Sequence, residues 1–66
     1  MEIILNGSVR NIPEQTSALE LLQSLDLADR RLALEINREI VPRSTFDRHM
    51  IEAGDTVEIV HAIGGG

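Results

Sequence analysis

The chain has 66 residues, which is enough for one domain and too few for two. With 42% hydrophobic residues, 26% charged residues and a single Phe, it has the composition of a globular domain with a core of Leu, Ile and Val. Eleven acidic and six basic residues give a net charge of −5, which disfavours binding to nucleic acid or an anionic membrane and favours a protein partner.

The first predicted element is a β-hairpin. Residues 1–5 are rich in β-forming side chains, and the pair Asn6-Gly7 tolerates the positive φ angles of a two-residue type I′ turn. Residues 8–12 are expected to form the return strand, with Ile4 facing Val9. These two side chains then lie on the outer face, exposed unless something covers them. The opposite face, assigned to the core, contains Met1, Ile3, Leu5 and Ile12.

A helix is predicted from about residue 17 to residue 26. Pro13-Glu14-Gln15 interrupts the preceding strand, and Ser17 with Glu20 matches a capping box, in which each residue binds a backbone N–H of the other. Apolar residues then recur at the spacing of one helical face, which suits packing across a sheet. The predicted face contains Leu19, Leu22 and Leu25, with Ala18 and Leu21 alongside.

Two short strands are predicted after the helix. Residues 32–37 alternate larger apolar side chains with small or polar ones, as a strand does. Asn37-Arg38 is the expected turn, and Ile40-Val41 forms a second extended segment that Pro42 ends.

The last part of the chain predicts an irregular helical turn and a final strand. The turn falls within residues 44–50, where Phe46 is expected to anchor it in the core, and a turn at 53–55 leads to a strand over 56–62. This order of elements predicts an α+β fold, in which a mixed sheet packs on one main helix, and it corresponds to the β-grasp arrangement.

Motifs of catalysis and metal binding are missing from the sequence. It contains no glycine-rich phosphate loop, no nucleophile elbow and no His, Asp and Glu cluster at ligand spacing. His49 and His61 each lack a second ligand at metal-site spacing, so both are interpreted as surface or packing residues. With no cysteine, the chain cannot itself carry a persulfide. We therefore predict no catalytic residue, no bound metal or cofactor, and no enzymatic activity.

The localisation is predicted from the hydropathy pattern. No charged leader precedes an apolar segment, and no apolar run approaches 18 residues. A soluble cytoplasmic protein is therefore expected.

The C-terminal Gly64-Gly65-Gly66 is the feature on which chemistry could depend. Glycine triplets also occur at frayed chain ends, so this segment alone leaves a functionless tail open. A segment without side chains can enter a channel too narrow for other residues, and the chain beyond Val60 could extend by roughly 20 Å. The carboxylate of Gly66 is expected to be free, as a group carrier requires. We predict a domain over residues 1–63 and a flexible tail over 64–66.

Four internal segments and the C-terminus carry a resemblance to a known family. They are Met1-Glu2-Ile3-Ile4-Leu5-Asn6-Gly7, Thr16-x-x-Leu19-x-Leu21-Leu22, Ile36-Asn37-x-x-Ile40-Val41-Pro42-Arg43, Gly54-Asp55-x-Val57-Glu58-Ile59-Val60 and Gly65-Gly66. With them, essentially the whole chain resembles the ThiS family of sulfur carriers, relatives of ubiquitin and of the small subunit of molybdopterin synthase.

The resemblance implies a ubiquitin-like fold and a carrier mechanism. A ThiF-like adenylyltransferase, similar to the ubiquitin activators, would use ATP and Mg to join Gly66 to AMP, because a carboxylate is a poor electrophile. Gly64 and Gly65 would thread the tail into that enzyme. Sulfur from a cysteine desulfurase or a persulfide relay protein would displace AMP and leave a thiocarboxylate on Gly66. A ThiG-like thiazole synthase would receive this sulfur in thiamine biosynthesis.

Partner recognition is predicted on the exposed face of the sheet. The first and last strands are neighbours in this fold, so their outward apolar side chains are expected to form one contact patch. Glu35 and Glu58 would flank the patch and meet a basic partner. Scattered apolar surface residues without function remain the alternative. The predicted contact residues are Ile4, Val9, Val60 and Ala62.

Three other functions stay open. The chain could be a carrier of the same fold for another sulfur pathway, or a ubiquitin-like modifier, or it could be an adaptor domain that carries nothing. His61-Ala62 stands where the molybdopterin-synthase subunit usually has prolines, and this difference favours the thiazole branch.

Overall fold

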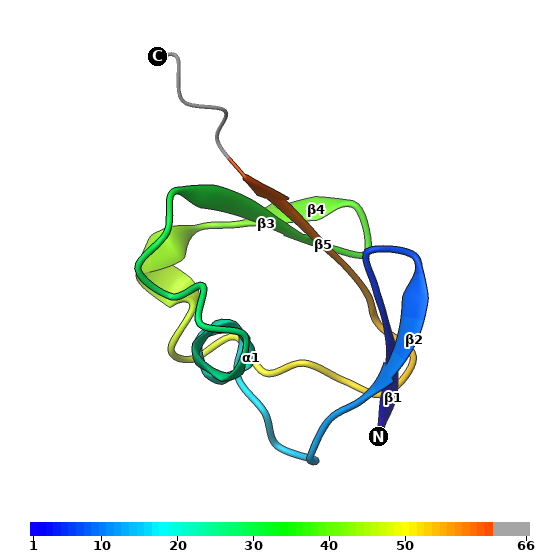
Figure 1. Ribbon diagram of the computed structural model, residues 1–66. Coiled ribbons are helices and arrows are strands. Elements are labelled where there is room, and N and C mark those ends of the chain that lie inside the picture. Colours follow the sequence, from blue (N-terminus) through cyan, green and yellow to red (C-terminus); the bar gives the residue numbers. More distant parts are fainter. Residues whose placement is uncertain (62–66) are drawn as a thin grey trace.

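The computed structural model describes residues 1–61; residues 62–66, which include the predicted tail and the end of the predicted domain, lie outside this part. Within it, five strands form one sheet that curves over an α-helix (Figure 1). The elements are β1 (Glu2–Leu5), β2 (Ser8–Asn11), α1 (Ala18–Ser24), β3 (Leu32–Ile36), β4 (Glu39–Val41), the 3₁₀ helix η1 (Arg43–Thr45) and β5 (Thr56–His61).

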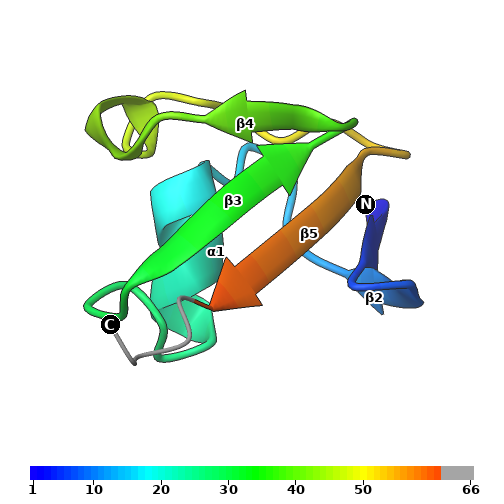
Figure 2. The ribbon, with the colours of Figure 1, turned by 90° about the horizontal axis from the view of Figure 1, so that it is seen from above.

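The sheet is mixed, as predicted, and its strand order is β2-β1-β5-β3-β4. The last strand, β5, therefore lies in the centre. It pairs parallel with β1, where Ile4 is level with Thr56, and antiparallel with β3, where Ile36 is level with Val57. Figure 2 shows β3 and β5 crossing above α1, so that the helix covers one face of the sheet. The predicted α+β fold is confirmed.

Two-residue turns set the register of both hairpins. Asn6 and Gly7 have φ angles of 49° and 85°, and the predicted pairing of Ile4 with Val9 is confirmed. Asn37 and Arg38 also have positive φ angles, 53° and 70°. The amide of Asn37 helps to hold the second turn, because its Nδ2 donates to Asp55 Oδ1 over 3.0 Å and its Oδ1 accepts from the backbone N–H of Thr56 over 3.0 Å.

The helix begins with the predicted capping box. Ser17 Oγ accepts from the backbone N–H of Glu20 over 3.0 Å, and Glu20 Oε1 accepts from the backbone N–H of Ser17 over 2.9 Å. The helix ends at Ser24, two residues earlier than predicted, because Asp26 turns the chain with a φ of 59°. The buried face of the helix is rotated relative to the predicted one. Ala18, Leu21 and Leu22 are buried, whereas Leu19 and Leu25 are only partly buried.

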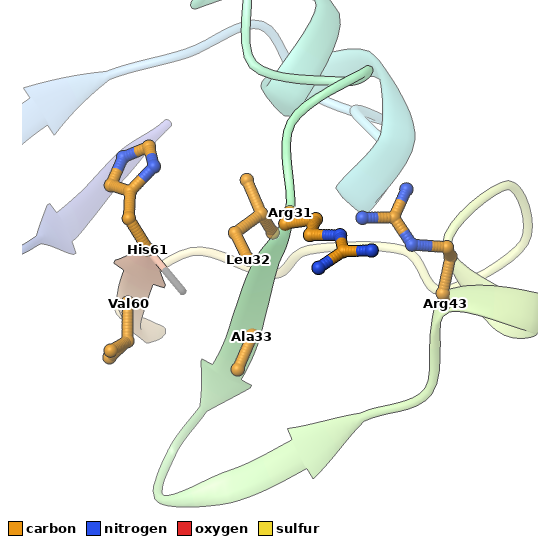
Figure 3. A pocket seen from close by; sticks show the side chains of 6 residues that line it. All are labelled: Arg31, Leu32, Ala33, Arg43, Val60 and His61. Carbon is orange, nitrogen blue, oxygen red and sulfur yellow. The ribbon is translucent and has the colours of Figure 1, made fainter. Parts of the chain in front are cut away.

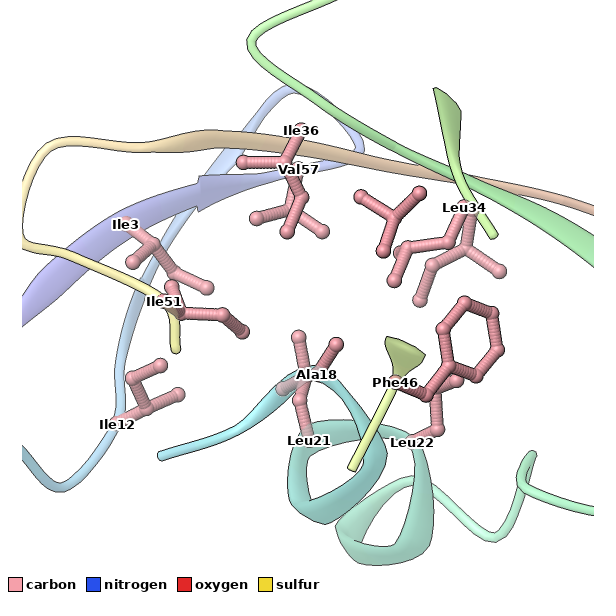
Figure 4. Close-up of a cluster of buried hydrophobic side chains, with 12 residues drawn as sticks. Ile3, Ile12, Ala18, Leu21, Leu22, Leu34, Ile36, Phe46, Ile51 and Val57 are labelled. Carbon is pink, nitrogen blue, oxygen red and sulfur yellow. The ribbon is translucent and has the colours of Figure 1, made fainter. Parts of the chain in front are cut away.

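The core lies between α1 and the inner face of the sheet (Figure 4). Leu34 and Val57, from the adjacent strands β3 and β5, are fully buried and face the helix. Phe46 is buried after η1, as predicted, and closes one end of the core. Among the described residues, every buried side-chain polar atom has a hydrogen-bond partner. The twelve buried apolar residues are Ile3, Ile12, Ala18, Leu21, Leu22, Leu34, Ile36, Val41, Phe46, Ile51, Val57 and Ile59.

Candidate functional site

The strand β5 leads from the centre of the sheet to the predicted tail. On one side, the backbone N–H of Asn6 donates to Val57 O over 2.9 Å, and the Asn6 side-chain oxygen accepts from the backbone N–H of Ile59 over 2.8 Å. On the other side, β5 pairs with β3 as far as Leu32 and His61. The strand that leads into the C-terminal segment is thus held on the β1 side as far as Ile59 and on the β3 side as far as His61. The predicted site residues Ala62, Gly64, Gly65 and Gly66 lie outside the described residues, and their roles remain predictions.

The predicted contact residues on the outer face fall into two areas. Ile4 and Val9 are direct cross-strand partners, and Val9 is 63% exposed. Val60 is 54% exposed and lies opposite Ala33 on β3. Because Ile4 is level with Thr56, Val60 lies four residues further along β5, a distance of about 13 Å. The strand register therefore separates Ile4 and Val9 from Val60, although all three lie on one face.

Two carboxylates lie between these apolar areas. Glu35 on β3 and Glu58 on β5 are directly opposite one another in the antiparallel ladder, and Ile40 on β4 lies on the other side of Glu35. Ile40 is 71% exposed. The expectation that the two glutamates flank the patch is corrected by this register, because they occupy the middle of the outer face. Sequence spacing could not reveal the pair, since it depends on how two distant strands align.

A shallow depression lies where β5 ends (Figure 3). Arg43 is fixed there: its guanidinium donates to Ala28 O over 3.3 Å and to Arg30 O over 2.8 Å, and lies 5.5 Å from the Phe46 ring centre. Arg31 extends towards Arg43, whereas His61 points away from Val60. The lining residues are Arg31, Leu32, Ala33, Arg43, Val60 and His61.

Sequence reasoning missed this basic depression. Arg31 and Arg43 come from separate parts of the chain, before β3 and after β4, and the hairpin that these strands form brings them together. The sequence drew attention to Arg43, because it ends the segment Ile36 to Arg43. Nothing in that segment indicated that Arg31 would lie beside it.

Neither a metal centre nor a membrane helix is found in the described part. Residues 1–61 contain no group of three or more His, Cys, Asp or Glu placed to hold a metal ion. None of the helices between residues 1 and 61 is long and apolar enough to cross a bilayer.

Comparison with known proteins shows which family the chain resembles. The family model that matches is the ThiS family, over residues 3–66. The sulfur carrier protein ThiS of Escherichia coli K12 is 33% identical over 66 residues, which cover both chains completely. A crystal structure of a thiamine biosynthesis protein (ThiS) from Geobacter metallireducens has a TM-score of 0.87 and 32% identity, and the match covers both chains completely.

A second kind of relative is a longer protein. Thiazole synthase of Paramagnetospirillum magneticum is 39% identical over 66 residues, which are the whole of this chain and 20% of that protein. The chain thus spans about a fifth of the length of this relative. The full-length matches confirm the resemblance to this family and the β-grasp fold. The family consists of carriers, which agrees with the prediction that the chain is not an enzyme. The chain belongs to the ThiS family of sulfur carrier proteins.

Proposed function

We propose that this chain carries sulfur as a thiocarboxylate on Gly66 and delivers it to the synthesis of the thiamine thiazole. The observation that carries the proposal is the match to the ThiS family model, which runs to residue 66 and so includes the terminal glycines. The full coverage of the Escherichia coli sulfur carrier supports it. The described domain supports it as well, because β5 is bonded on the β1 side as far as Ile59 and pairs with β3 as far as His61, where the C-terminal segment begins.

The proposed chemistry proceeds through an activated acyl group. A carboxylate oxygen of Gly66 attacks the α-phosphorus of ATP, and pyrophosphate leaves with the electron pair of the broken P–O bond. The terminal sulfur of a partner's persulfide then attacks the Gly66 carbonyl carbon, and AMP leaves. A second thiol on a partner reduces the resulting S–S bond, which releases the thiocarboxylate and forms a disulfide between partner cysteines. This chain, which lacks cysteine, supplies only the acyl group.

The proposal assigns catalysis to three partners. They are a ThiF-like adenylyltransferase, which binds the ATP and Mg, a cysteine desulfurase or persulfide relay protein, and a ThiG-like thiazole synthase. The match to a fifth of a thiazole synthase supports the last partner, because a segment similar to this carrier is part of that protein. It also favours the thiazole pathway over the other sulfur pathways. We place the carrier and its partners in the cytoplasm.

The experiment that tests the proposal is intact-mass analysis of the full chain after incubation with adenylyltransferase, ATP, Mg and a persulfide source. A product about 16 Da heavier is expected, because sulfur replaces oxygen, and fragmentation should map the change to Gly66. A chain that ends at Gly64 should give no such product and should retain the wild-type melting temperature. An added mass that maps to an internal residue would overturn the proposal.

A further inference from the structure

The positively charged side chains of this chain are all arginines. The sequence contains six arginines, no lysine and no cysteine. Every one of these arginines is exposed. They are Arg10, Arg30, Arg31, Arg38, Arg43 and Arg48.

The fold accounts for this choice at one position. The guanidinium of Arg43 donates to the carbonyl oxygens of Ala28 and Arg30, which uses two donors of its planar fork. Arg48 makes an exposed ion pair with its neighbour Asp47 over 3.7 Å, and a lysine would serve there as well. At exposed positions without a forked contact, lysine and arginine support folding and solubility alike. Folding therefore does not explain why lysine is missing altogether.

An activated acyl group distinguishes lysine from arginine. The ammonium group of lysine is in equilibrium with a neutral amine that can attack an acyl carbon, whereas the guanidinium group stays protonated in proteins. Attack of an amine on adenylated Gly66 would form a C–N bond and break the bond between the carbonyl carbon and the phosphate oxygen. AMP would leave with the electron pair of that bond, and a proton would be released to water. The amide is stable, so the carrier would be lost for sulfur transfer.

Two of the arginines lie where the C-terminal segment begins. Arg31 directly precedes Leu32, which pairs with His61 at the end of the β3–β5 ladder, and Arg43 lines the same depression (Figure 3). The five residues after His61 span at most about 17 Å, which is enough for the Gly66 carbonyl carbon to come near a side chain at position 31. A lysine at this position would act within the same molecule and so at a high effective concentration.

The amino group of Met1 is an amine that the chain does contain, and it lies far from this place. It donates to Ile12 O over 2.6 Å. Ile4 is level with Thr56 in the parallel pair, so Met1 lies three residues to one side of this level and His61 lies five residues to the other. The separation along the sheet is about 26 Å, and Figure 1 shows the N-terminus and the end of β5 on opposite sides of the domain. The amino group is therefore beyond the reach of the C-terminus of its own chain.

The hydroxyl and imidazole groups of the chain give no lasting product. A hydroxyl group attacks an acyl carbon only when a base takes its proton. An imidazole that accepts the acyl group remains an activated acyl donor, which water or a thiol cleaves again. Lysine is thus the side chain that would trap the activated end permanently.

We propose that the arginines, and Arg31 above all, are specificity-determining residues: they place positive charge beside the C-terminal segment without an amine that takes the Gly66 acyl group. The acyl group is thereby reserved for the sulfur nucleophile of a partner. Transfer to an amine of the same chain would close a ring, and transfer to a second copy would begin a polymer. The proposal rests on the proposed function, because it requires Gly66 to become an acyl donor.

The test uses the full chain prepared with Gly66 as a thioester of a small thiol, which is an acyl donor that needs no partner enzyme. Incubation at about pH 8 leaves a small fraction of a lysine side chain neutral. The wild-type thioester should give only the free acid. Arg31→Lys should give a product about 18 Da lighter than the free acid, because an amide forms within the chain, and fragmentation should link Gly66 to residue 31. Its thioester should disappear at least about tenfold faster than that of the wild type.

The matched control is Arg10→Lys. Arg10 is level with Ile3 on β1, and lies two strands away from β5 and roughly 20 Å along the sheet from His61, which exceeds the span of the C-terminal segment. The ring should form at least about tenfold more slowly than in Arg31→Lys. Both variants should melt within about 2 °C of the wild type, because each replaces one exposed cation by another.

Each result bears on one proposal at a time. An Arg31→Lys thioester that hydrolyses at the wild-type rate without an amide would overturn the inference and leave the proposed function intact. Equal ring formation in Arg10→Lys would overturn the special place of Arg31. Amide-linked dimers of the wild type would also overturn the inference, since the chain would then trap itself through Met1. Failure of the wild type to gain sulfur in the enzymatic assay would overturn the proposed function, whatever the thioester does.

Discussion

The two faces of the sheet are built from the same strands and obey different requirements. On the inner face, Leu34 and Val57 are fully buried against α1. On the outer face of the same strands, Val60 is exposed and the carboxylates of Glu35 and Glu58 face one another. The inner face is arranged as packing and burial require. The outer face is free of that requirement, and it places two like charges opposite one another, an arrangement expected to weaken the free domain.

The largest expected effect comes from the inner face. Leu34→Ala should lower the free energy of unfolding by about 2–5 kcal/mol, because it removes buried methyl groups and leaves a cavity in a small core. Urea denaturation followed by circular dichroism measures this change. Ile40→Ala, on the exposed outer face of the neighbouring strand β4, is the matched control and should cost less than about 1 kcal/mol. Similar losses for the two variants would contradict the distinction between the faces.

A pair of identical substitutions on β5 sharpens the comparison. Val57→Thr keeps the shape of the side chain but buries a hydroxyl group, and should cost about 1–3 kcal/mol of unfolding free energy. Val60→Thr, three residues later and exposed, should change it by no more than about 0.5 kcal/mol. Thermal melts of both variants provide the measurement. If Val60→Thr destabilised as much as Val57→Thr, Val60 would be a core residue and the outer face would need reassignment.

The smallest expected effect has the opposite sign. Glu58→Gln removes one of the facing charges and should stabilise the domain by about 0.2–1 kcal/mol. The gain should shrink when the same denaturation is repeated in high salt, because screening already weakens the repulsion in the wild type. A loss of stability on this substitution would show that Glu58 makes a favourable contact in the free domain.

Local sequence signals predicted the local parts of the fold. Asn6-Gly7 set the first turn and its register, and Ser17 with Glu20 formed the capping box, because each motif acts within four residues. The helix was predicted two residues too long, since Asp26 adopts a left-handed conformation that its residue type permits without requiring. The core face of α1 was misplaced towards Leu19 because leucines occur on both sides of the helix.

The candidate site was less predictable, since it depends on pairing between distant segments. The outward direction of Val9 and Val60 followed from strand alternation. Glu35 and Glu58 lie opposite one another only because β3 and β5 pair in this register. Arg31 and Arg43 lie in one depression only because β3 and β4 form a hairpin. No spacing within either segment encodes these alignments. The carrier role itself came from the resemblance, which the family match confirmed.

The parallel pairing of β1 with β5 has a mechanical consequence. Between these strands, Gly54 N–H donates to Glu2 O, Ile4 N–H to Asp55 O, and Asn6 N–H to Val57 O, over 2.8–2.9 Å. A pull on the end of β5 against an anchored β1 would act along the strands, so these bonds would bear the tension together instead of breaking one after another. A force applied at His61 along β5 is therefore resisted by several hydrogen bonds at once, and the domain should stay folded under a load that would open a hairpin one bond at a time.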